Sequence, residues 1–208
     1  MKCEFLISKD IMPNCDDPIT GGIEANAVII NRDDIDFVAT VFNATRKNVI
    51  ENLVLKSGRR GYGVFVMGNQ PFNNTQTTME EGVNRNSFTN DLGMVILDND
   101  PDICAQVIDN LANGTFVVVF ENKHKNKNKA VNAGDSVFQI MGYFQGLRAT
   151  TLENNKYSED TEGGWNVLLQ ETRVPRSGLF LFNGTFEATR TVFESLTEQR
   201  FVGNLPPP

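Results

Sequence analysis

The apolar residues of this chain come in short runs, and this spacing limits the possible folds more than any other feature. The longest runs are Ala27–Ile30, Met94–Leu97 and Phe116–Phe120. A helix that crosses a bilayer needs about 20 predominantly apolar residues, so the sequence predicts no transmembrane helix. Short apolar runs bounded by turn residues are typical of buried strands. We therefore expect a mainly β protein that does not associate with a membrane.

Length and charge narrow the class of protein. The chain has 208 residues, of which 40% are hydrophobic and 22% charged. A chain of this size hides roughly 70% of its unfolded surface on folding, so a core is possible without metal or disulfide support. The formal net charge of -7 argues against a dedicated nucleic-acid-binding protein, which is usually basic. The odd set of Cys3, Cys15 and Cys104, without a secretory signal, predicts reduced thiols and a protein made inside a cell.

Turn residues divide the chain into three parts. We expect an N-terminal arm over residues 1–24, a single β-rich domain over 25–198 and a Pro-rich C-terminal tail over 199–208. Within the domain, the sequence predicts strands at 27–31, 92–97, 116–120, 135–147, 164–172 and 179–182. Segments 49–56 and 61–67 flank the turn residues 57–60 and predict a hairpin. A helix over 44–55 fits the same apolar spacing and is the competing interpretation.

Two helices are predicted beside these strands. Asp100 is a good N-cap and Pro101 suits the first helical position, so we expect a helix over 101–112 that ends at Asn113-Gly114. The second helix is expected over 186–198, with an apolar side that includes Phe186 and Phe193. The fold class is therefore mainly β (α+β): an antiparallel β-sandwich or barrel with one or two flanking helices and long loop or arm extensions.

Residues 68–90 differ from the rest of the domain because they contain almost no core-forming side chains. A structureless loop of about 20 residues is uncommon in a compact domain, and such a loop is functional or a linker. We therefore interpret 68–90 as a long polar loop.

The sequence offers weak signals for chemistry. Asp98-x-Asp100-x-Asp102 resembles the start of a calcium loop, but Ile103 stands where glycine is needed, and helix capping explains the same residues. The carboxylates of 33–36 and 159–162 lie in polar turns where solvent keeps them ionised. The single histidine, His124, makes most zinc sites and most histidine catalysis unfavourable. We expect no enzyme activity, no cofactor and no metal.

A lysine-rich tract interrupts this acidic chain. Lys123, Lys125, Lys127 and Lys129 alternate with asparagines in a predicted loop over 121–133. Such a run is usually a solvated hairpin loop. It is also suited to an electrostatic contact with an acidic neighbour, so these four lysines are candidate contact residues.

Several segments together resemble small virion proteins of tailed bacteriophages, most like tail tube (major tail) proteins. The residues that carry the resemblance are Cys15-Asp16-Asp17-Pro18 with Gly21-Gly22, Val28–Ile35, Leu55–Gly58 before Tyr62, Leu111–Gly114 followed by Glu121-Asn122-Lys123, Phe138–Tyr143 with Gly146-Leu147, and Gly163–Leu169. They cover about residues 15–197.

The resemblance implies a function without catalytic residues. A tail tube protein is a β-sandwich or barrel subunit that self-assembles into rings, usually hexameric, and the rings stack into a channel that conducts DNA. Sheets continue between subunits, and a long loop reaches the next ring. Segment 68–90 would be that loop, with the candidate inter-subunit contacts Phe72, Asn73, Asn74, Met79, Val83 and Phe88.

The expected partners are further copies of the chain, other virion proteins, and DNA only as passing, non-specific cargo. The expected location is the virion, assembled in the cytoplasm of the host bacterium. An acidic wall suits a DNA channel because it repels phosphates and prevents sticking. The alternatives are another phage structural component (capsid cement or decoration, neck or baseplate protein) and a small ligand-binding module.

Overall fold

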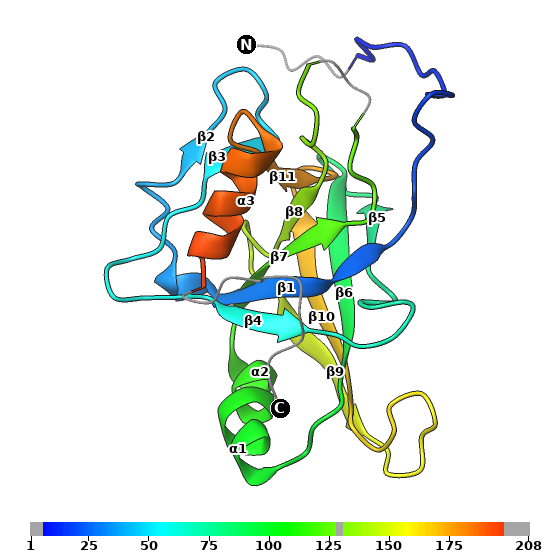
Figure 1. Ribbon diagram of the computed structural model, residues 1–208, viewed down its shortest axis with the longest axis vertical. Coiled ribbons are helices and arrows are strands. Elements are labelled where there is room, and N and C mark those ends of the chain that lie inside the picture. Colours follow the sequence, from blue (N-terminus) through cyan, green and yellow to red (C-terminus); the bar gives the residue numbers. More distant parts are fainter. Residues whose placement is uncertain (1–5, 128–130, 198–208) are drawn as a thin grey trace.

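The protein is mainly β and contains two sheets (Figure 1). The computed structural model describes residues 6–127 and 131–197. The seven-stranded sheet has the order β2-β3-β11-β8-β7-β1-β4, and the four-stranded sheet has the order β5-β6-β10-β9. Strand pairs in these residues are antiparallel except β3 with β11, which are parallel. The strands are β1 (Ile23–Asn31), β2 (Val41–Phe42), β3 (Val49–Asn52), β4 (Tyr62–Phe65), β5 (Gln76–Glu80), β6 (Ser87–Ile96), β7 (Phe116–Asn122), β8 (Phe138–Met141), β9 (Arg148–Asn154), β10 (Trp165–Val174) and β11 (Leu179–Leu181).

The central strands of the seven-stranded sheet are buried on both faces. On one face, Val28 and Ile30 of β1 share a core with Phe193 of helix α3 (Phe186–Ser195). On the other face, Ala27 belongs to a second core that includes Leu169 of β10 in the four-stranded sheet. We call this second cluster the inter-sheet core. Because β1 and β7 contribute to both cores, their sequences are continuous apolar runs, as predicted for buried strands.

One continuous helix closes an end of the inter-sheet core. It comprises α1 (Pro101–Ile103), a π-helical turn (Cys104–Ile108) and α2 (Asp109–Asn113), and we call it helix 101–113. The Asp100 carboxylate accepts a hydrogen bond from the Ile103 N–H at 2.7 Å, and Gly114 follows the last turn. The predicted boundaries and N-cap are confirmed, and Asp100 serves as a capping residue rather than as the start of a calcium loop.

The predicted hairpin of 49–56 with 61–67 is wrong, although both segments contain strands. β3 lies second in the seven-stranded sheet, whereas β4 lies at its far edge beside β1. Gly61 explains part of this placement, since a Cβ atom there would lie 2.6 Å from Val28 Cγ1. The absence of a side chain lets the chain pack closely against β1 before it continues as β4. The alternative helix over 44–55 is also wrong, because this segment forms β3.

The predicted long loop over 68–90 is wrong as well. Residues Gln76–Glu80 form β5, which pairs with β6 from Ser87 onward in a β-hairpin. The segment before β5 packs closely: Gly93 of β6 has no side chain, and a Cβ there would lie 2.1 Å from the Asn73 carbonyl oxygen. The prediction failed because β5 is an edge strand of threonine and other polar residues, which gives no apolar alternation.

The N-terminal arm is described from residue 6, and residues 6–22 form no helix or strand before β1 begins at Ile23. The predicted tail over 199–208 and Lys129 lie outside the described residues. In the part of the chain that the structure describes, no helix has the length and apolar character needed to cross a bilayer.

Candidate functional site

The outward face of the four-stranded sheet is polar. Val167 and Leu169 of β10 point into the inter-sheet core, so Leu168 and Gln170, which alternate with them, point away from it. On this outward face, Asp91 of β6 accepts hydrogen bonds from Gln76 Nε2 of β5 at 3.1 Å and from Gln170 Nε2 of β10 at 2.8 Å. A carboxylate held between two amides therefore links three neighbouring strands and orders this face.

The charge of this polar face is slightly negative. Strand register places Glu80 on the same side as Gln76, and Glu153 opposite Asn166. Arg148 lies opposite Gln170 on the same face. β10 also carries the exposed Arg173. Three carboxylates with Asp91 included, against two guanidiniums, leave a small excess of negative charge, which is unfavourable for binding a phosphate backbone.

Both edges of the four-stranded sheet are open. β5 pairs only with β6, and β9 pairs only with β10, among the residues that the structure describes. Every residue of β5 except the half-buried Thr77 is exposed. An open edge presents unpaired N–H and C=O groups and can add a strand from another chain.

A buried carboxylate fixes this sheet against the seven-stranded sheet. The Glu171 side chain of β10 is 1% exposed. Its Oε1 accepts hydrogen bonds from the Gln145 N–H at 2.7 Å and the Gly146 N–H at 3.3 Å. Its Oε2 accepts from the Gly142 N–H at 2.8 Å and from Asn90 Nδ2 at 3.2 Å. The turn after β8 is thereby held to β10, and four donors compensate the burial of the charge.

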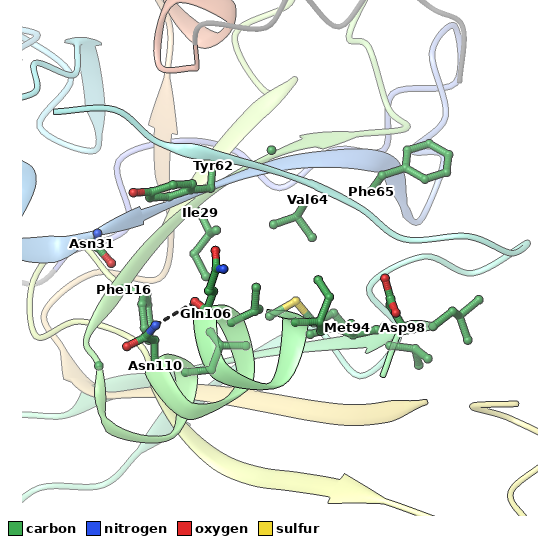
Figure 2. A pocket seen from close by; sticks show the side chains of 18 of the residues that line it. Ile29, Asn31, Tyr62, Val64, Phe65, Met94, Asp98, Gln106, Asn110 and Phe116 are labelled. Atoms are coloured by element: carbon green, nitrogen blue, oxygen red, sulfur yellow. Dashed lines mark hydrogen bonds between the residues drawn. The ribbon is translucent and has the colours of Figure 1, made fainter. Parts of the chain in front are cut away.

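An apolar groove lies between strand β4 and helix 101–113. It has a volume of about 890 Å³. Figure 2 shows Ile29, Val64 and Met94 pointing into it, whereas Phe65 points away. Within the described residues β4 pairs only with β1, so one side of the groove is a free strand edge. Asp98 and Gln106 supply polar groups to the lining.

The N-terminal arm carries exposed apolar side chains and is held near its base by a turn. Leu6, Ile7, Ile11, Met12 and Ile19 are between 78% and 87% exposed. His124 holds the arm, because the Thr20 N–H donates to His124 Nδ1 at 3.4 Å and the Asp17 carboxylate lies 4.0 Å from His124 Nε2. The Lys123 N–H also donates to the Gly22 carbonyl at 2.9 Å. Beyond these contacts, the apolar residues of the arm are available to a partner.

No family model, curated protein or solved structure matches this chain. Functional proposals for this chain therefore depend on the geometry of the described residues.

The predicted contact residues of segment 68–90 do not form one loop. Phe72 is 2% exposed and belongs to the inter-sheet core, so its interpretation as an anchor for a neighbouring subunit is wrong. Asn73 and Asn74 are exposed beside β6. Met79 is 60% exposed and Val83 fully exposed on the β5–β6 hairpin, and Phe88 is half-buried. Only the hairpin residues offer apolar surface to another molecule.

The lysine tract is less free than the sequence indicated. Lys125 Nζ lies 2.5 Å from Glu121 Oε1 and 3.1 Å from Glu24 Oε1, so its charge is paired within the chain. Lys123 Nζ donates to the Asn69 carbonyl at 3.4 Å. Lys127 is exposed. Two of the four candidate lysines therefore stabilise the turn and the base of the arm.

The structure does not gather reactive groups into one site. Among residues 6–127 and 131–197, no group of three or more His, Cys, Asp or Glu is arranged to hold a metal ion. Burial raises the pKa of Tyr143, and the nearby Arg32 opposes this shift. Tyr143 packs edge-on against Phe37 and Phe42 with ring centroids 5.3 and 5.5 Å away, so its surroundings are those of a packing residue.

Sequence reasoning missed Glu171, although a signal was present. Val167, Leu169 and Glu171 alternate, which places all three on the buried face of a strand. A carboxylate in this position requires buried donors. Three of its four donors come from the glycine-containing turn 142–146 and the fourth is Asn90 of β6. These residues are distant from Glu171 in sequence, and only the fold brings them together.

Proposed function

We propose that this protein is a non-enzymatic structural subunit of a phage virion, and that it assembles with identical copies into stacked rings that form the tail tube. The observation that supports the proposal most is the four-stranded sheet, which has two open edges and a polar outward face. Such a sheet can continue from one copy into the next.

Strand direction favours a closed ring. The four strands alternate in direction, since β5, β6, β10 and β9 pair antiparallel in that order. β5 and β9 therefore run in opposite directions. When β5 of one copy lies beside β9 of its neighbour in the same orientation, the new pair is also antiparallel. A ring of n copies then forms a barrel of 4n strands without edges, which removes the exposed strand edges of the single copy.

The size of such a barrel suits a channel for DNA. Neighbouring strands lie about 4.8 Å apart. Six copies, the number that the resemblance implies, would give a barrel roughly 37 Å across between backbones, and wider if the strands are tilted. The polar face with Glu80, Asp91 and Glu153 would line this barrel. Its negative charge would let a phosphate backbone pass without binding.

Proline substitutions on β5 test the proposal. Successive N–H groups of a strand point to opposite sides, so one of Thr77 and Thr78 directs its N–H toward β6 and the other toward the open edge. Of Thr77→Pro and Thr78→Pro, we expect one variant to keep a wild-type melting temperature and to lose ring formation in negative-stain microscopy. The other variant, which removes a hydrogen bond within the chain, is the matched control and should melt at a lower temperature.

Two results would contradict the proposal. One is a wild-type protein that remains monomeric in sedimentation at all concentrations. The other is ring formation that neither proline affects. Stable trimers that decorate shells would support the alternative of a capsid cement protein.

A further inference from the structure

The two apolar features without a partner lie at opposite ends of the molecule. Figure 1 shows the N-terminal arm at one end of the long axis and helix 101–113, which forms one wall of the groove, at the other. The groove and the arm of one chain are therefore placed to meet only in different copies.

The groove end is strongly acidic. Eight exposed carboxylates lie in the segment before the helix, on the helix, at Glu153 of β9 and in the loop between β9 and β10; this loop also carries Lys156. The carboxylates are Asp98, Asp100, Asp102, Asp109, Glu153, Glu159, Asp160 and Glu162. The segment before the helix and the loop adjoin, since Trp165 Nε1 at the start of β10 donates to Asn99 Oδ1 at 3.0 Å. Of these carboxylates, Asp98 lines the groove itself and the others lie at the same end of the molecule; we call the whole set the acidic rim.

This rim limits what can occupy the groove. Two copies that met groove to groove would bring their rims together, and like charges across an interface are unfavourable. A symmetric contact through this end is therefore disfavoured. The occupant must be apolar and must not add negative charge.

The arm end meets both requirements. Residues 6–12 carry four apolar side chains, each at least 78% exposed, and the charges of Lys9 and Asp10 cancel. Lys127 follows the turn that holds the base of the arm, and it is exposed. Residues 13–16 connect this segment to the held base of the arm and can extend at most about 14 Å, which provides reach to an adjoining copy.

We propose that residues 6–12 of one copy dock in the groove of the next copy, so that copies stack head to tail. The arm lies along the free edge of β4, its apolar side chains contact Val64 and Met94, and Lys9 faces the acidic rim. Because the two surfaces differ, each copy gives one arm and receives one, and the contact repeats without closing. Under the proposed function, this contact joins one ring to the next.

Mixing two variants tests the proposal. The arm variant is Ile7→Asp/Ile11→Asp. The groove variant is Met67→Asp/Leu97→Asp, at two groove residues that are 62% and 45% exposed. Each variant alone should associate head to tail at least about 30-fold more weakly than the wild type. A 1:1 mixture should restore pairing, because the intact arm of one variant meets the intact groove of the other. Each pair then has one damaged arm and one damaged groove left over, so pairs of single copies or of rings should not extend into stacks.

The readout is sedimentation velocity combined with negative-stain microscopy, with melting temperature as the test of folding. Val38→Asp/Val41→Asp is the control, since it also replaces two exposed apolar side chains and should stack like the wild type. If the groove variant melts at a lower temperature than the control, Met67→Gln/Leu97→Gln replaces it.

The outcomes separate this inference from the proposed function. Wild-type rings that stack, together with a mixture that fails to pair, would overturn the arm–groove contact and leave the ring proposal intact. Stacking that both variants retain would do the same. A wild-type chain that never associates would overturn both proposals.

Discussion

Glu171→Gln tests whether the buried carboxylate holds the two sheets together. Glu171 accepts four hydrogen bonds, three of them from backbone N–H groups of the turn 142–146. Glutamine has one acceptor oxygen, and its NH₂ group would face Gly142 on one side or Gln145 and Gly146 on the other. In either orientation a donor meets a donor.

The expected loss follows from these contacts. A hydrogen bond to a charged group contributes about 1.5–3 kcal/mol, and the substitution removes two of them, so the free energy of unfolding should fall by about 3–6 kcal/mol. For a chain of this size, such a loss lowers the melting temperature by roughly 10–20 °C. Glu171→Leu should be at least as harmful, because it leaves three buried N–H groups without an acceptor.

Urea unfolding followed by fluorescence measures this loss directly. The chain has one tryptophan, Trp165, and it lies half-buried in the same strand as Glu171. Glu153→Gln is the matched control, since that carboxylate is exposed on β9 and should change the unfolding free energy by at most about 0.5 kcal/mol. A Glu171→Gln protein within about 1 kcal/mol of the wild type would refute the idea that this cluster stabilises the sheet packing.

Three further substitutions test other parts of the structure. Phe72→Ala should cost about 3–5 kcal/mol in urea unfolding because Phe72 is 2% exposed, whereas Val83→Ala at the fully exposed hairpin should cost almost nothing; equal effects would contradict the packing of segment 69–75. Asp100→Ala should lower the free energy of unfolding by about 1 kcal/mol because it removes the N-cap, whereas Asp100→Ser should keep most of the stability that the cap contributes. Equal losses would argue against capping. Burial raises the pKa of Tyr143 above 10.0 in the folded state, so its contribution to stability is complete below pH 10.0 and is lost as the pH rises through the raised value. Tyr143→Phe should flatten the fall of the melting temperature with pH above pH 10.0. An unchanged slope would contradict the raised pKa of Tyr143.

The sequence predicted a helix or strand correctly where the residues that determine it are neighbours in the chain. The helix beginning at Pro101 was predicted from its cap and its first residue, and both act within a few residues of the helix start. The buried strand at Phe116–Phe120 was predicted from its continuous apolar run. These signals depend on neighbours in the chain, and the structure confirms both elements.

Pairing between strands was not predictable in the same way. Alternation in 49–56 and 61–67 indicates strands but does not identify their partners. β3 pairs with β11, which follows it by more than a hundred residues. β5 escaped prediction because one of its faces is open to solvent and the other meets the edge of the core, so its polar sequence resembles a loop.

The candidate contact surfaces were predictable only in part. The sequence placed Met79 and Val83 on an exposed segment, and both are exposed. It could not show that Phe72, in the same segment, turns into the inter-sheet core. The groove beside β4 depends on the placement of β4 at a sheet edge, which no nearby residue indicates.

The parallel pair of β3 and β11 affects when the chain can finish folding. β11 lies between β3 and β8, so within the described residues it connects β2 and β3 to the other four strands of their sheet. During synthesis, β2 and β3 have no place in the sheet until residues 179–181 leave the ribosome. A nascent chain therefore stays incomplete until almost its last element, and contacts of such long sequence separation form slowly. Chains truncated before β11 would retain two unattached strands and would be prone to aggregate rather than to assemble.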